Sequence, residues 1–193
     1  MSGAELDNNR LGQDGRAYSF DGAPDRIDLG STEFVNTDEP FSVSFWIYFD
    51  GYDDNCHDVA MLNSNGGAEA AFKIFTCDDS NYSGITFGSD ESDNWGWQHT
   101  DVSDNSQLLD RWAHVVITYN GDGNSDTSNF SQYIDGETQG LTGSGGIGAP
   151  DDGNRSFIGT DGRSDVGWNG RIDDFRIYDR ELSPSEVEAL SSM

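Results

Sequence analysis

Basic residues are scarce in this sequence. Of its 193 residues, 36 are acidic and 10 are basic, which gives a formal net charge of −26 at pH 7, and Lys73 is the only lysine. Nucleic acids and anionic membranes bind proteins largely through clusters of lysine and arginine that displace counterions from phosphates. We therefore expect neither a nucleic acid nor an anionic membrane surface as a partner.

Long hydrophobic runs are also missing. No stretch approaches the roughly 20 apolar residues that a membrane-spanning helix needs, so we predict no membrane insertion. The N-terminal residues carry neither a basic start nor a hydrophobic segment, which indicates that this chain has no secretory signal peptide. We still expect an extracellular, cell-surface or virion-surface location, reached by another route such as lysis or as part of a longer secreted protein.

The acidic excess is larger than solubility requires. Such a charge repels itself in dilute buffer, whereas at 1 M salt a Debye length of about 3 Å screens it. The composition therefore favours adaptation to molar salt. The alternative is an acidic extracellular protein that binds several calcium ions.

The apolar segments are short and alternate with polar residues, as in residues 59–62, 72–75 and 85–87, and clusters of Gly, Asn, Asp and Ser separate them. This pattern is typical of an all-β sandwich. Near the end of the chain, Ser183 followed by Pro184 and Glu186 predicts a capped helix. We predict an N-terminal extension over residues 1–14 and a single domain over residues 15–193.

Four segments occur in the order and spacing of a known family: residues 17–29, residues 41–48, residues 111–121 with 132–136, and residues 170–190. Together they resemble Laminin-G-like domains of the concanavalin A-like jelly-roll superfamily. The resemblance implies a jelly-roll β-sandwich of two antiparallel sheets with a short C-terminal helix. Its known members include lectins, adhesion modules, enzyme accessory domains and some glycosidases, so fold alone does not assign a function.

Catalytic motifs are missing. Glucanases of this superfamily carry Glu-x-Asp-x-Glu on one strand, which places nucleophile and acid on one face; the nearest match here, residues 91–95, lacks the second glutamate. His57, His99 and His114 do not have the spacing of transition-metal ligands. We predict that the protein is not an enzyme.

Asp173 lies in an alternating segment, where it is expected to share a strand face with Phe175 and Ile177. A carboxylate on an apolar face needs a metal ion, an arginine or several backbone amides as partner. One alternative is a salt bridge to Arg26 or Arg171 without a metal.

The resemblance implies the other alternative, a structural calcium ion held between the opening turn and the final strand. Calcium prefers six to eight oxygen ligands. The carbonyl groups of Asp21 and Gly22 and the carboxylates of Asp25 and Asp173 are the expected ligands.

A second candidate site contains tryptophans. Trp95, Trp97 and His99 alternate and would share one strand face, where indole rings could stack on sugars. The neighbouring candidates for ligand contacts are Asn94, Tyr52, Tyr82 and Trp168. The alternative is that these aromatic residues fill the core, which is the role we expect of Trp46.

Cys56 and Cys77 flank two expected strands. They form either a disulfide, which favours an extracellular location, or a pair of buried free thiols.

These observations predict a non-catalytic, salt-adapted and calcium-stabilised adhesion module whose partners are glycans or surface glycoproteins. One alternative is a structural virion-surface protein of a halophilic virus, such as a decoration, spike or turret, that contacts itself or other virion or envelope proteins. Another is an accessory domain of a secreted hydrolase.

Overall fold

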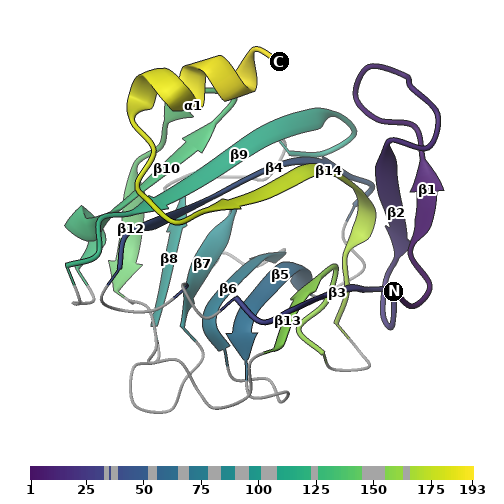
Figure 1. Ribbon diagram of the computed structural model, residues 1–193, viewed down its shortest axis with the longest axis horizontal. Helices are drawn as coiled ribbons and strands as arrows, with labels where there is room; N and C mark the ends of the chain where they lie inside the picture. Colours follow the sequence, from purple (N-terminus) through teal and green to yellow (C-terminus); the bar gives the residue numbers. More distant parts are fainter. Residues whose placement is uncertain are drawn as a thin grey trace.

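The computed structural model describes residues 1–32, 35, 39–51, 56–64, 70–77, 84–89, 96–100, 108–122, 126–144, 155–162 and 166–193. In these residues the chain forms two antiparallel sheets of seven strands each and one short helix near the C-terminus (Figure 1). The predicted jelly-roll sandwich is confirmed.

The first sheet has the strand order β1-β2-β14-β4-β9-β10-β11. The final strand β14 lies between β2 and β4, so the two ends of the chain meet inside one sheet. A short 3-10 helix, Thr127–Asn129, precedes β10. The strands are β1 (Glu5–Asp7), β2 (Ala17–Asp21), β14 (Asn169–Tyr178), β4 (Phe41–Phe49), β9 (Trp112–Tyr119), β10 (Phe130–Ile134) and β11 (Glu137–Thr138).

The second sheet has the order β12-β8-β7-β6-β5-β13-β3. Its centre is a run of neighbours along the chain, from β5 to β8, which pair as successive antiparallel strands. The strands are β12 (Leu141–Ser144), β8 (Gly96–Thr100), β7 (Thr86–Ser89), β6 (Ala70–Cys77), β5 (Cys56–Ser64), β13 (Arg155–Ile158) and β3 (Ile27–Gly30).

The core lies between the sheets. Because side chains alternate along a strand, Phe41, Phe45 and Phe49 of β4 all face inward, and they join Phe72 and Ile74 of β6 in one fully buried cluster. The alternate residues of β4, which are Ser42, Ser44, Trp46 and Tyr48, point to the opposite face of the sheet. Each sheet therefore has an outer face on which functional side chains can lie.

Helix α1 (Pro184–Ser191) covers part of the outer face of the first sheet (Figure 1). Val187 of the helix packs with Val116 of β9 and Tyr133 of β10. The predicted cap is confirmed, because the Glu186 carboxylate accepts hydrogen bonds from the backbone N–H and the hydroxyl of Ser183, at 2.9 and 2.8 Å. The residues at the start of β14, near Asn169, do not belong to the cluster that packs against the helix.

The N-terminal residues belong to the sandwich. Residues 1–14, which we expected to form an extension, include β1, the edge strand that pairs with β2. Within the described residues, no helix is long and apolar enough to cross a membrane.

Strand β14 contains an irregularity that changes which face Asp173 occupies. The register against β4 shifts between Asp173 and Arg176, and Asp174 has a φ of 50°. Asp173 is therefore paired with Trp46 on the outer face, while Phe175 and Ile177 pack against the core. The prediction that these three residues share a face is wrong, because a bulge interrupts the alternation.

Trp46 is also placed differently from the prediction. It alternates with the buried residues of β4 and is partly exposed on the outer face, where the guanidinium carbon of Arg10 lies 4.6 Å from its ring centroid. It is not a core residue.

Candidate functional site

The predicted aromatic site lies on the outer face of the second sheet. In β8, Trp97 and His99 are partly exposed and alternate with buried Gly96, Gln98 and Thr100, so the prediction that Trp97 and His99 share a face agrees with the structure. Tyr52, Tyr82, Asn94 and Trp95, the other candidates in this group apart from Trp168, lie outside the described residues.

Trp97 is held in place by a second aromatic ring. Its indole meets Phe75 of β6 at 4.8 Å between ring centroids, in an edge-on arrangement of 87°. Strand β7 lies between β6 and β8, and its residue opposite Trp97 is Gly88. A Cβ at Gly88 would collide with the carbonyl oxygen of Gly96. The close approach of β7 to β8 at this point therefore requires a residue without a side chain.

The same sheet face carries a buried charged cluster that the sequence analysis did not assign. Lys73 of β6 lies 3.0 Å from Asp58 Oδ1 and donates a hydrogen bond of 3.0 Å to Asp161 Oδ2. Both aspartates are fully buried and Lys73 is 5% exposed. The signal in the sequence was the only lysine, placed inside the apolar run Phe72–Phe75.

Burial gives this cluster an unusual protonation equilibrium. Desolvation raises the pKa of Asp58 to about 7, Lys73 opposes that rise, and the neighbouring Asp161 adds to it. Two carboxylates therefore share one ammonium group, and the pKa of one of them is close to neutral pH. Neither carboxylate is exposed, so the pair does not present an acid and a nucleophile to a glycosidic bond in the way that glycosidases do.

Trp168 is not a surface residue. It is fully buried, and its ring packs 4.9 Å from that of Phe49, in the core between the sheets. Since no part of the side chain reaches the surface, its prediction as a ligand-contacting residue is corrected to a packing role.

The predicted calcium ligands do not converge in the structure. β14 pairs with β2 so that Asn169 lies opposite Asp21, and Asp173 is four residues further along the strand, roughly 13 Å away at about 3.3 Å per residue. Asp173 instead forms an ion pair of 2.6 Å with Arg10. A salt bridge was the expected alternative, but its partner is neither Arg26 nor Arg171.

The opening turn has its own carboxylate contacts. Asp25 is 8% exposed, and its Oδ2 accepts a hydrogen bond of 3.1 Å from the backbone N–H of Asp21. Burial, together with the charge of Asp21, raises the pKa of Asp25. Gly22 lies between them with a φ of 100°. Among the described residues no group of three or more acidic, histidine or cysteine side chains could hold a metal ion, and calcium stays a prediction for this turn.

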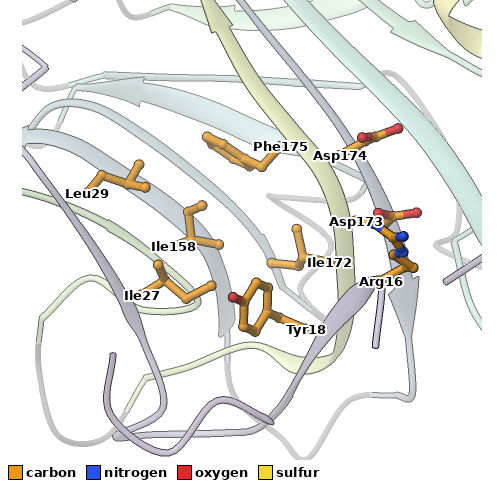
Figure 2. A pocket seen from close by; sticks show the side chains of 9 residues that line it. All are labelled: Arg16, Tyr18, Ile27, Leu29, Ile158, Ile172, Asp173, Asp174 and Phe175. Carbon is orange, nitrogen blue, oxygen red and sulfur yellow. The ribbon is translucent and has the colours of Figure 1, made fainter. Parts of the chain in front are cut away.

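A cavity of about 300 Å³ opens between the sheets beside β14. Figure 2 shows its apolar side chains facing one another across the space, whereas Asp173, Asp174 and Arg16 lie on the other side of the strand. The charged residues Arg16, Asp173 and Asp174 complete the lining. The side chains that face the space are apolar apart from one tyrosine hydroxyl. These side chains are Tyr18, Ile27, Leu29, Ile158, Ile172 and Phe175.

Cys56 and Cys77 form a disulfide between the paired ends of β5 and β6. The two cysteines lie directly opposite one another in the register, on the same outer face as Phe75. The bridge joins the ends of two interior strands of the sheet, two residues along β5 from Asp58 of the charged cluster. Of the two alternatives, the structure contains the bonded form.

Comparison with known proteins gives a consistent family. The family described as "Concanavalin A-like lectin/glucanases superfamily" matches residues 21–188 of the chain. No curated protein sequence matches significantly.

Solved structures share the fold at low sequence identity. A heptameric SAP-like pentraxin from Limulus polyphemus is 15% identical, with 90% of this chain and 80% of that chain covered and a TM-score of 0.63. Domain 4 of AbnA, an extracellular arabinanase from Geobacillus stearothermophilus, solved in complex with arabinotriose, is 20% identical over 97% and 81% of the two chains, also with a TM-score of 0.63. The receptor binding domain of a botulinum neurotoxin C/D mosaic serotype is 17% identical over 98% and 44%, with a TM-score of 0.61.

Proposed function

Because the chain belongs to the concanavalin A-like lectin/glucanases superfamily, we propose that it is a non-catalytic recognition module for glycans or surface glycoproteins. The observation that carries the proposal is the partly exposed indole of Trp97, braced edge-on by Phe75 on the outer face of the second sheet. A solved domain of the same fold in complex with arabinotriose supports carbohydrate as the ligand class.

The geometry around Trp97 suits a sugar ring. An indole that is already fixed by packing loses little conformational entropy when a ligand stacks on it. His99 lies on the same face, and exposed Thr142 of β12 is directly opposite His99. These two side chains supply hydrogen-bonding groups next to an apolar surface, which is the combination that carbohydrate sites use.

The proposed module does not hydrolyse its ligand. The pair of carboxylates on this face, Asp58 and Asp161, is buried around Lys73. We assign this cluster a structural role, in which it ties β5 and β6 to the segment that follows β13.

The large negative charge supports a function at high salt concentration. A protein with a formal charge of −26 repels itself in dilute buffer, and molar salt removes that repulsion. Single shallow sugar sites bind weakly, so useful adhesion requires display in many copies on a cell envelope or a virus particle.

The test is glycan binding of the purified protein in about 2 M KCl. A glycan panel selects a neutral oligosaccharide, and titration calorimetry then compares the wild type with Trp97→Ala. Trp46→Ala is the matched control, because Trp46 is also partly exposed but lies on the outer face of the first sheet. Thermal denaturation establishes that each variant is folded.

We expect Trp97→Ala to lose binding at least tenfold and Trp46→Ala to keep it. Trp97→Phe retains a ring against Phe75, so its affinity for the glycan should lie between those of the wild type and Trp97→Ala. Equal binding by wild type and Trp97→Ala would refute the site. No binding to any glycan, together with ordered self-association in the same buffer, would support the structural virion-surface alternative.

A further inference from the structure

We propose that Arg171 is the centre of a second binding site, on the outer face of the first sheet, which takes the carboxylate of an acidic sugar. We call Arg171, Tyr48 and Trp112 the Arg171 platform. It lies on the opposite side of the sandwich from Trp97, so it is independent of the site proposed above.

The platform is a row of side chains across neighbouring strands. In the sheet register Arg171 of β14 lies opposite Tyr48 of β4, and Tyr48 lies opposite Trp112 of β9. On the other side of Arg171 the neighbour is Ser19 of β2. All four side chains are partly exposed. None of these four residues belongs to the cluster under helix α1. That cluster contacts β14 at Tyr178, the last residue of the strand.

Two aromatic rings hold the guanidinium in place. The guanidinium carbon of Arg171 lies 4.0 Å from the ring centroid of Tyr48 and 5.7 Å from that of Trp112. The two rings meet edge-on at 5.8 Å. A guanidinium stacked on a ring keeps its N–H groups in the plane of the fork, where they can still donate hydrogen bonds.

Those donors have no carboxylate partner in the described part of the chain. No ion pair and no side-chain hydrogen bond joins Arg171 to another described residue, in a protein with 36 acidic residues. Apart from Arg16, which forms no ion pair with a described residue, the other arginines on this side of the molecule are paired. Their ion pairs are Arg10 with Asp173, Arg111 with Asp135, Arg176 with Asp174, and Arg180 with Glu186.

The molecule itself contains an occupied version of this arrangement. The guanidinium carbon of Arg10 lies 4.6 Å from the ring centroid of Trp46. Its two terminal nitrogens form ion pairs with the carboxylates of Asp173, at 2.6 Å, and Asp174, at 3.3 Å. Arg10 and Arg171 therefore share the same stacking on an aromatic ring and differ in whether a carboxylate is present. The comparison points to a carboxylate as the group that Arg171 takes from a ligand.

The exposed aromatic surface favours a sugar as the carrier of that carboxylate. A uronic acid presents its carboxylate on a rigid ring whose C–H groups can pack on Tyr48 and Trp112, while its hydroxyls can reach Ser19. The nearest acidic side chain of the same row, Glu5, is opposite Ser19 on β1 and two strands from Arg171. At molar salt a Debye length of about 3 Å removes the long-range repulsion by the remaining acidic residues.

The experiment titrates trigalacturonate and its neutral counterpart, a galactose trisaccharide, into the full chain in about 2 M KCl. The variants are Arg171→Gln, which removes the charge, and Arg171→Lys, which keeps the charge but loses the fork. Arg16→Gln is the matched control, because Arg16 is an exposed arginine that also has no ion-pair partner among the described residues. Triglutamate tests a peptide as the source of the carboxylate.

We expect wild type to bind trigalacturonate at least tenfold more tightly than the neutral trisaccharide. Arg171→Gln should abolish this preference, Arg171→Lys should retain part of it, and Arg16→Gln should leave it unchanged. Equal affinity of wild type for the two sugars, or an unchanged preference in Arg171→Gln, would overturn the site. Triglutamate binding as tight as trigalacturonate binding would overturn the assignment to a sugar. Loss of neutral-glycan binding in Trp97→Ala is a separate result and does not bear on Arg171.

Discussion

Replacing Lys73 by methionine tests the buried cluster most sharply. Methionine keeps most of the aliphatic volume but removes the ammonium group that lies 3.0 Å from both Asp58 and Asp161. Both carboxylates remain fully buried. The substitution therefore leaves two acidic groups in a low-dielectric environment without a counterion.

Removing one partner of a buried ion pair costs about 4 kcal/mol of unfolding free energy. For a domain of this size that corresponds to a fall in Tm of roughly 8–16 °C. The cost should depend on pH. The pKa of Asp58 is raised from 3.8 to about 7 in the folded protein, so between these values the folded state binds more protons than the unfolded state, and the contribution of this group to stability decreases as pH rises.

Lys73 lowers the pKa of Asp58, so its loss moves that pKa further upward. At pH 5 a protonated Asp58 can donate a hydrogen bond to Asp161, and the substitution should cost less. At pH 8 the loss of unfolding free energy caused by Lys73→Met should be largest. Adding Asp58→Asn to Lys73→Met should recover most of the loss at pH 8, because an amide does not need a counterion.

Urea denaturation in about 2 M KCl at pH 5 and pH 8 measures these differences. Arg111→Met is the control, because the Arg111–Asp135 pair at 2.8 Å is 41% exposed on both sides and should contribute under about 1 kcal/mol. The reasoning would be refuted if Lys73→Met lost no more unfolding free energy than Arg111→Met. It would also be refuted if the loss for Lys73→Met were the same at both pH values.

Three further predictions concern other parts of the fold. Burial lowers the pKa of His114 from 6.5 to about 4, so stability should fall as pH drops through that window, and His114→Gln should show a smaller fall in urea denaturation; equal slopes would contradict this. Replacing Cys56 and Cys77 by serine should cost about 3 kcal/mol in the chain-entropy model for a loop of this length, and unchanged urea midpoints would contradict it. Calcium should raise the Tm through the opening turn, so that Asp25→Asn abolishes the response and Asp173→Asn does not; a response that needs Asp173 would restore the original four-ligand set.

The fold could be predicted because its signals are local. Short alternating apolar segments predicted the strands, and the cap of helix α1 depends on residues three positions apart. The same alternation correctly paired Trp97 with His99 on one face of β8. Each of these inferences requires only neighbouring residues, and the two antiparallel sheets are the architecture that the family resemblance implied.

The errors arose where long-range contacts or backbone irregularities decide the outcome. The bulge at Asp174 turned Asp173 to the outer face, and no local pattern marks it. Its partner Arg10 is 163 residues away in sequence. Trp168 lies among polar loop residues but is buried against Phe49, a contact that only the assembled sandwich creates.

The most direct test of the central claim is a crystal structure of the protein with a neutral oligosaccharide that it binds, grown in molar salt. We expect a sugar ring on the outer face of the second sheet, in contact with the indole of Trp97. A ligand bound at the opening turn around Asp25, or in the cavity beside β14, with no contact to Trp97, would contradict it.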